Sequence, residues 1–206
     1  KIKKLIHDIC DFRVKLSKIP KNVSELDKDF VEDSITENTL EIQSLQYALD
    51  HANNEEWKGQ IRMMLAMHTS DLQQALAVAQ KIGADTEPDL THASVYPETP
   101  DYDLGKRYEN LVEEYLDPLM NTTGVDFDTL SMDIIEDEHV ADVQGELAAE
   151  RLVKNNELRA FAKHAADVTE LHLLVMGDLK HRLVDNYTPP EPEFQADYQS
   201  PRKFNP

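Results

Sequence analysis

Apolar residues recur at intervals of three and four along most of the chain, as they do on the buried face of an amphipathic helix. The first such run is ended by Pro20, and a later run that follows the Asn53-Asn54 pair stops at Gly83. No stretch alternates with a period of two for long enough to predict a strand. The pattern therefore predicts helices over residues 2–19, 32–52, 55–83, 108–119, 128–153 and 157–184.

The four longest predicted helices form two hairpins that resemble each other. A shift of 101 residues takes Glu41 to Asp142, whereas the helices after the turns align at a shift of 96, which takes His68 to His164. The change of shift implies about five additional residues just after the first turn. We therefore predict an internal duplication, and an all-α four-helix bundle whose hairpins pack against each other.

The domain organisation follows from the same pattern. We expect residues 1–186 to form a single helical bundle, with an extra N-terminal helix and a short crossover helix, and the proline-rich segment 187–206 to be extended or disordered. Within the bundle we expect hairpin one at 27–83, a crossover at 84–125 and hairpin two at 126–186.

Acidic residues and histidines lie at matching heights of the two hairpins, because they are similar numbers of residues from the turns. His68, His139 and His172 lie on predicted inner stripes, where a polar group is costly unless it is paired or coordinates an ion. A metal ion between the hairpins would remove that cost. The predicted ligands are Glu37, Glu41, His68, Asp71, Glu138, His139, Asp142, His164, Asp167 and His172.

Composition narrows the classes of partner. The net charge of −19 disfavours nucleic acids and anionic membrane surfaces and favours cations. No apolar run approaches the length of a membrane span, and the single cysteine cannot form an internal disulfide or a thiolate metal cluster. Metal ions are thus the expected partners, and a homo-oligomer is compatible with the sequence.

Convergence of acidic residues and histidines from four helices resembles the ferritin-like superfamily. Asp27 or Asp29 near Phe30, followed by Ile35, the pair Glu37-Asn38 and Ile42, is similar to the start of an uncharacterised ferritin-like family of extracytoplasmic proteins. That family has His-His pairs where this chain has Glu37-Asn38 and Glu138-His139. The resemblance covers residues 27–83 and 126–184 and implies an extracytoplasmic or secreted metal-binding protein.

The leading hypothesis is metal binding or sequestration, with iron, manganese, zinc and copper as the candidate ions. A carboxylate-bridged dinuclear oxidase is an enzymatic alternative, although a Gly-rich phosphate loop and a Gly-x-Ser-x-Gly elbow are absent. A copper-handling site of Met63, Met67 and His68 is a second alternative, since thioethers and imidazoles suit Cu(I). A metal-free helical interaction module is the third.

Two further expectations follow from the sequence. Sequons at Asn22, Asn121 and Asn186 would be glycosylation sites in a secreted eukaryotic protein. Histidine ligands with an unperturbed pKa of about 6.5 would release a metal as the pH falls through that region.

Overall fold

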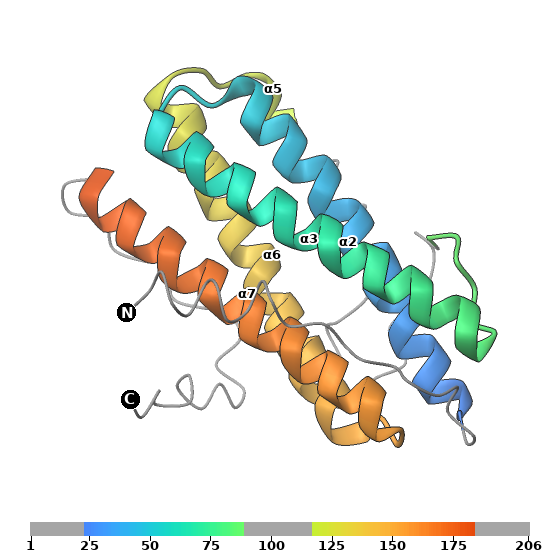
Figure 1. Ribbon diagram of the computed structural model, residues 1–206. Coiled ribbons are helices and arrows are strands. Elements are labelled where there is room, and N and C mark those ends of the chain that lie inside the picture. Colours follow the sequence, from blue (N-terminus) through green and yellow to red (C-terminus); the bar gives the residue numbers. More distant parts are fainter. Residues whose placement is uncertain (1–22, 89–116, 184–206) are drawn as a thin grey trace.

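The protein is a bundle of long helices in the computed structural model, which describes residues 23–88 and 117–183 (Figure 1). The predicted all-α architecture is confirmed for this part of the chain. The predicted N-terminal helix, most of the predicted crossover helix and the predicted tail lie outside the described residues, as do Asn22 and Asn186. The helices are α2 (Glu25–His51), α3 (Glu55–Ile82), α5 (Asp117–Met120), α6 (Val125–Leu152) and α7 (Asn156–Leu183).

Helix α2 begins earlier than the apolar periodicity predicts, because its start is fixed by a capping box. The hydroxyl of Ser24 accepts a hydrogen bond from the backbone N–H of Asp27 at 3.3 Å. The carboxylate of Asp27 accepts one from the backbone N–H of Ser24 at 2.7 Å. These bonds satisfy donors that a helix start otherwise leaves unpaired, so the helix extends beyond its apolar stripe.

The second helix of each hairpin begins at an asparagine cap. The side-chain oxygen of Asn54 accepts two backbone N–H groups of α3, both at 2.9 Å. That of Asn155 accepts two backbone N–H groups of α7, at 2.9 and 3.2 Å. Both helices span 28 residues. Equal caps and equal lengths leave no room for five additional residues.

The register of the repeat is therefore 101 throughout, and the shift of 96 predicted for the second helices is wrong. His68 is equivalent to Thr169 rather than to His164, and Asp71 is equivalent to His172. The shift of 96 was chosen because it aligns His68 with His164. The asparagine caps fix where the two helices begin, so they determine the register more reliably than a single pair of identical residues does.

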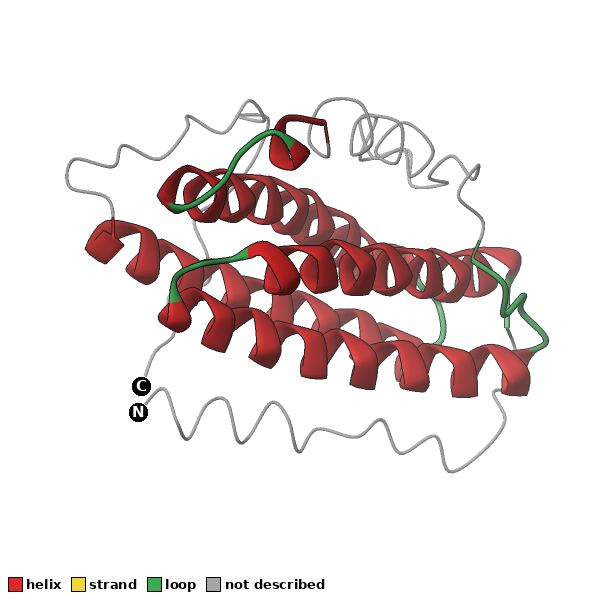
Figure 2. Cartoon of the chain, turned by 90° about the horizontal axis from the view of Figure 1, so that it is seen from above, coloured by secondary structure: helices red, strands yellow, loops and turns green. Residues whose placement is uncertain are grey.

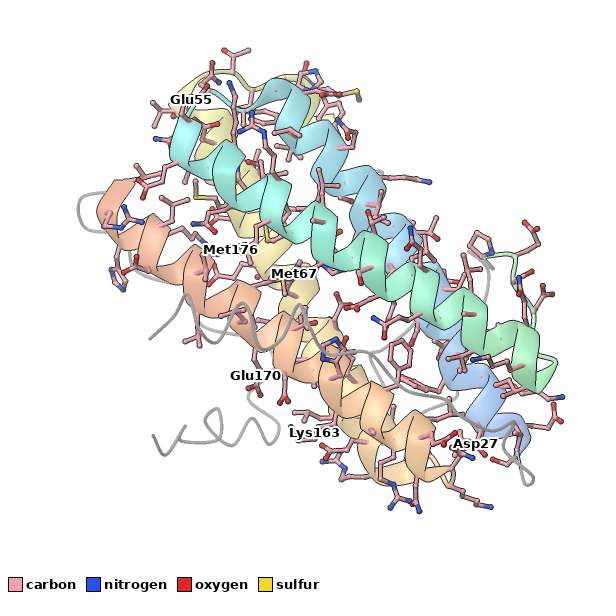
Figure 3. All side chains as sticks on the ribbon, in the orientation of Figure 1. Asp27, Glu55, Met67, Lys163, Glu170 and Met176 are labelled. Atoms are coloured by element: carbon pink, nitrogen blue, oxygen red, sulfur yellow. The ribbon has the colours of Figure 1, made fainter. Side chains whose placement is uncertain are left out.

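Each hairpin holds the turn of the other. The carboxylate of Asp128, at the start of α6, accepts the backbone N–H groups of Asn53 and Asn54 at 2.8 and 2.9 Å. Asp27, at the end of the bundle where α2 begins (Figure 3), accepts those of Lys154 and Asn155 at 2.9 and 3.2 Å. We call this pair of contacts the reciprocal caps.

Loss of a reciprocal cap is expected to destabilise the protein. Asp128→Ala leaves two backbone N–H groups of a partly buried turn without their carboxylate, at a cost of about 1–3 kcal/mol for each unsatisfied group. Urea unfolding measures the difference. Asp126→Ala is the matched control, because Asp126 is an exposed acid in the same first turn of α6. Equal midpoints for the two variants would contradict the assignment.

The neighbouring long helices are antiparallel. The reciprocal caps join the end of α2 to the start of α6, and the ion pair of Arg182 with Glu56, 2.5 Å long, joins the end of α7 to the start of α3. Residue 85 lies beside the start of α2, since its backbone N–H bonds Glu32 at 2.7 Å. Helix α3 therefore ends, and α6 begins, at opposite ends of the bundle, which Figure 2 shows from above.

The two larger apolar clusters lie toward opposite ends of the bundle. One cluster, around Phe30 and Phe161, lies toward the start of α2, and another, around Leu45 and Trp57, lies toward its end. Between these clusters, several positions midway along the four long helices are polar and buried, including Glu41, His68, His139, Asp142, Thr169 and His172. A polar layer at the centre of a bundle is unfavourable unless its groups satisfy one another or bind a ligand.

Candidate metal centre

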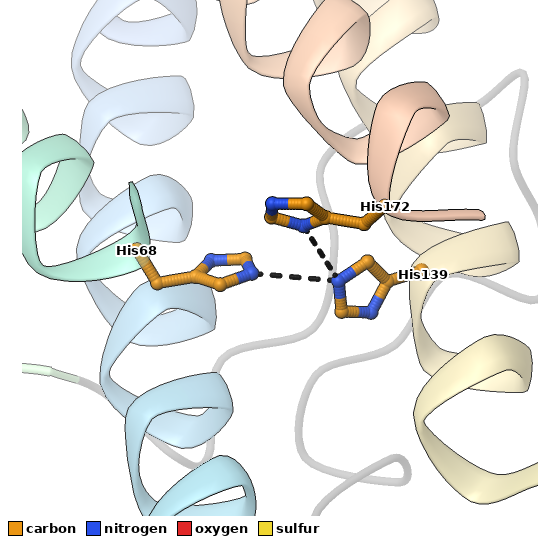
Figure 4. Close-up of side chains that lie close together, drawn as sticks. All are labelled: His68, His139 and His172. Atoms are coloured by element: carbon orange, nitrogen blue, oxygen red, sulfur yellow. Dashed lines mark hydrogen bonds between the residues drawn. The ribbon is translucent and has the colours of Figure 1, made fainter. Parts of the chain in front are cut away.

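Three histidines from three helices meet in this polar layer (Figure 4). His68 comes from α3, His139 from α6 and His172 from α7. Nε2 of His139 lies 3.4 Å from Nε2 of His68 and 3.0 Å from Nδ1 of His172. We call these three residues the histidine triad. His139 and His172 are 0% exposed and His68 is 6% exposed, so water contributes little to their solvation.

The orientation of His68 is set by its neighbour Asn38. The side-chain NH₂ of Asn38 donates to the carbonyl oxygen of Ser34 at 2.8 Å, which turns its amide oxygen toward His68. Nδ1 of His68 lies 3.0 Å from that oxygen and must carry the proton in order to donate. Nε2 of a neutral His68 is therefore unprotonated and presents its lone pair to the other two histidines. A hydrogen bond from the remote ring nitrogen is the arrangement typical of metal-ligating histidines.

His172 is oriented by Met67. Nε2 of His172 lies 3.3 Å from the sulfur of Met67, a weak acceptor, so this nitrogen is the donor. Its Nδ1 then faces Nε2 of His139 across 3.0 Å, a gap that holds one proton. Together with the bare Nε2 of His68, the triad presents three nitrogen atoms to one point and a single proton to share. A bound cation would replace that proton.

Carboxylates lie on the other side of His139. Oε1 of Glu41 is 3.7 Å from Nδ1 of His139, and one ligand atom from each of Glu41, His139 and Asp142 lies within 4.8 Å of the others. Glu41 and Asp142 are each 3% exposed. They place negative charge beside the triad, where it offsets the charge of a cation held by neutral imidazoles.

Burial favours the neutral form of His68 and His172. It lowers the pKa of His68 to about 4, assisted by the neighbouring His139, although Asp71 and Asp142 act in the opposite direction. Burial likewise holds the pKa of His172 well below its usual range, with His139 and His68 contributing. Neutral imidazole is the form that binds metals.

The spacing of the triad suits a metal ion. Zinc binds imidazole nitrogen at about 2.0–2.1 Å, which places the ligand atoms of a tetrahedral site about 3.4 Å apart. The nitrogen separations of 3.0 and 3.4 Å are close to this value. All three ligand nitrogens lie within 4.8 Å of one another. The donor set therefore fits a borderline transition-metal ion, and the backbone already holds the side chains at ligand spacing.

Of the other predicted ligands, Glu37, Asp71 and His164 are buried, and Glu138 is partly buried. Asp71 and His164 form a buried pair between α3 and α7, with Oδ1 and Nε2 3.6 Å apart, and Glu37 is buried on α2. Glu138 is partly buried on α6, next to His139 in sequence but turned away by the helix.

Asp167 is a correction. It forms an ion pair with Lys163 at 2.6 Å, on a partly exposed face of α7 on which Figure 3 labels Lys163, and the structure does not bring it to the polar layer. The prediction for Asp167 rested on the shift of 96, which differs from the observed register of 101 by five residues. Five residues are more than one turn of helix, so Asp167 does not occupy the inward-facing position that His172 holds.

Asn38 and Glu146 also belong to the layer and were not among the predicted ligands. Asn38 orients His68, and Glu146 is 8% exposed on α6, one turn beyond Asp142. Both lie on inner stripes with spacings of three and four that contain predicted ligands, and this was the signal that could have found them.

The copper alternative grouped Met63, Met67 and His68. In the structure the sulfur of Met67 contacts His172, and Met63 packs against Met67 in a small cluster with Val168 and Leu171. Asn121, the one sequon within the described residues, is exposed in the turn that follows α5. In the described residues, no helix is long and apolar enough to cross a membrane.

The fold and the polar layer define a four-helix bundle whose centre carries a group of histidines and carboxylates able to hold a metal ion. Residues 15–179 match the family described as a domain of unknown function, DUF4142, and the chain belongs to that family. The comparison with curated proteins gave no match.

A solved structure of a DUF305 protein from Streptomyces coelicolor, described as secreted, has a similar fold. It superposes with a TM-score of 0.61 at 10% sequence identity, covering 77% of this chain and 93% of that one. At this identity the likeness concerns the arrangement of helices alone.

Proposed function

We propose that the protein binds one divalent transition-metal ion through the histidine triad and sequesters it, with Glu41 and Asp142 supplying the balancing charge. The observation that carries the proposal is the set of three buried imidazole nitrogens directed at one point, two of them oriented by Asn38 and Met67. Apolar residues would stabilise the same bundle better, so a polar centre of this kind indicates a ligand.

The burial of the site favours retention of an ion over catalysis on it. His139 and His172 are completely buried, and the two acids are nearly so. The antiparallel helices and the long connection between the hairpins support a ferritin-like bundle, in which sites are built from facing helices. The secreted structural neighbour supports an extracytoplasmic location.

Cu(I) is the second candidate, because the thioether of Met67 lies 3.3 Å from His172. The charge of the surroundings favours a divalent ion instead, since two buried carboxylates flank the triad. Imidazole and carboxylate donors suit zinc, iron and manganese, whereas thioethers favour Cu(I).

Titration of metal-free protein with Zn²⁺ in competition with a chromophoric chelator tests the proposal. We expect a tightly bound equivalent of Zn²⁺ and a rise in the midpoint of thermal unfolding, because an ion that binds only the folded state stabilises it by about 2.7 kcal/mol at a concentration of 100 Kd.

Met67→Leu separates the two candidate ions. A zinc site on the triad should keep its affinity within a few-fold, because the methionine contacts only the remote nitrogen of His172. A copper site that uses the sulfur should lose Cu(I) affinity at least tenfold. Absence of binding of either ion would leave a helical interaction module.

A further inference from the structure

A second buried polar group lies beside the histidine triad, toward the start of α2. Each of the four long helices contributes one residue: Glu37 from α2, Asp71 from α3, Glu146 from α6 and His164 from α7. All four are between 6 and 8% exposed. Because side chains tilt toward the start of their helix and α2 is antiparallel to α6, the carboxylates of Glu37 and Glu146 approach each other along the bundle axis.

The carboxylate of Glu146 is incompletely satisfied. Its Oε2 has no hydrogen-bond partner among the described residues, although the side chain is more than nine-tenths buried. Its Oε1 lies 3.3 Å from the hydroxyl of Thr169, but that hydroxyl also lies 3.1 Å from the carbonyl oxygen of Ala165. One hydroxyl proton cannot serve both acceptors fully. A buried carboxylate in this condition needs either a proton or a cation.

The groups that face Glu146 are acidic as well. Burial, followed by the charges of Glu37, Asp142 and Asp71, raises the pKa of Glu146 well above its usual range, and the bond from Thr169 offsets only part of this. A cation placed among these carboxylates would remove the repulsion that the metal-free form relieves by protonation.

The pair of Asp71 and His164 has the spacing of two ligands of one ion. Oδ1 of Asp71 lies 3.6 Å from Nε2 of His164, which is too far for a good hydrogen bond. Two ligands at 2.0–2.2 Å from a metal ion are separated by about 3.4 Å in a tetrahedral site and somewhat less in an octahedral one. Gln74 donates to the same Oδ1 of Asp71 at 3.2 Å and helps to hold it in place.

We propose that Glu37, Asp71, Glu146 and His164 bind a second divalent cation, distinct from the ion of the histidine triad. Three carboxylates and one imidazole form a harder donor set than three imidazoles, so this site should prefer Mn²⁺ or Fe²⁺. It goes beyond the proposed function, because its residues do not include any member of the triad.

The repeat does not explain this group. At the shift of 101, Glu146 is equivalent to Leu45 and His164 is equivalent to Met63. The equivalent positions in the other half of the bundle are therefore apolar at two of four places. The acidic residue at position 146 therefore has no acidic equivalent in the first hairpin. This is expected for a residue that serves a ligand rather than the repeat.

Mn²⁺ binding to metal-free protein, followed by electron paramagnetic resonance of the free ion, tests the proposal. Wild-type protein should bind one equivalent, and Glu146→Gln should weaken binding at least tenfold because it removes a charged ligand while keeping the shape. His164→Gln should act in the same direction. Asp167→Asn is the matched control, since it removes an acid of α7 that pairs with Lys163 outside the layer.

A triad variant separates this site from the proposed function. His172→Leu should keep Mn²⁺ binding and lose the Zn²⁺ of the triad, whereas Glu146→Gln should do the reverse. Circular dichroism and thermal unfolding of the metal-free variants establish that each is folded. Wild-type Mn²⁺ affinity in both Glu146→Gln and His164→Gln, or loss of Mn²⁺ in His172→Leu alone, would overturn the second site while leaving the triad to be judged by Zn²⁺.

Discussion

Replacing His172 by leucine should abolish tight Zn²⁺ binding without unfolding the protein. The variant removes one of three nitrogen ligands at the centre of the layer, and we expect at least a hundredfold loss of affinity. Metal-free His172→Leu should be at least as stable as the metal-free wild type, because leucine gains about 1.5–3 kcal/mol on burial and needs no hydrogen bond.

The two effects have opposite signs, and this makes the prediction specific. Zinc should raise the unfolding temperature of wild-type protein and not that of the variant. His51→Ala is the matched control, because His51 is exposed at the end of α2. A variant that is strongly destabilised without metal yet still stabilised by Zn²⁺ would identify His172 as a core residue only.

Metal retention should extend to lower pH than solvated histidines allow. Because burial lowers the pKa of His68 to about 4 and holds that of His172 well below its usual range, protons should displace zinc nearer pH 4 than the unperturbed value of about 6.5. The expectation from the unperturbed value is thereby revised. Zinc release, followed with a chromophoric chelator between pH 7 and 4, measures the midpoint, and a midpoint at 6.5 would show that the triad is solvated.

The same pKa values give metal-free protein a defined dependence on pH. The unfolded chain takes up protons on its histidines below about pH 6.5, whereas folded His68 does so only near 4. Below 6.5 the unfolded state therefore binds more protons, and stability is lost as the pH falls from 6.5 to 4. For His68 alone the loss is on the order of 3 kcal/mol. Urea midpoints of His68→Asn should fall less steeply over this window than those of wild-type protein.

The periodicity of apolar residues was sufficient to predict the helices, since each long helix buries a continuous stripe. It was also sufficient to select His68, His139 and His172, because a histidine on an apolar stripe departs from the pattern around it. The periodicity could not show which residues of different helices lie at the same level of the bundle. The assignment of Asp167 failed for this reason, because a shift of five residues turns a helical position away from the axis.

The partners of the triad also required three dimensions. Asn38 is an ordinary amide in sequence, and only the bond from its NH₂ group to Ser34 shows that its oxygen is available to His68. The start of α2 was missed for a comparable reason, since Ser24 and Asp27 form their capping box outside the apolar run. Glu146 shares its stripe with His139 and Asp142, but the sequence does not show that one of its carboxylate oxygens is buried without a hydrogen-bond partner.

The reciprocal caps make the molecule comparable to an isologous dimer with its two protomers fused. Asp27 of the first hairpin seals the turn of the second, Asp128 of the second seals the turn of the first, and a two-fold rotation exchanges the two contacts. The reciprocal caps therefore do not depend on the covalent connection between the hairpins. If the chain were divided into two fragments with one hairpin each, each reciprocal cap would have its carboxylate on one fragment and its turn on the other. The histidine triad would form only when the fragments associate, since His68 belongs to one fragment and His139 and His172 belong to the other.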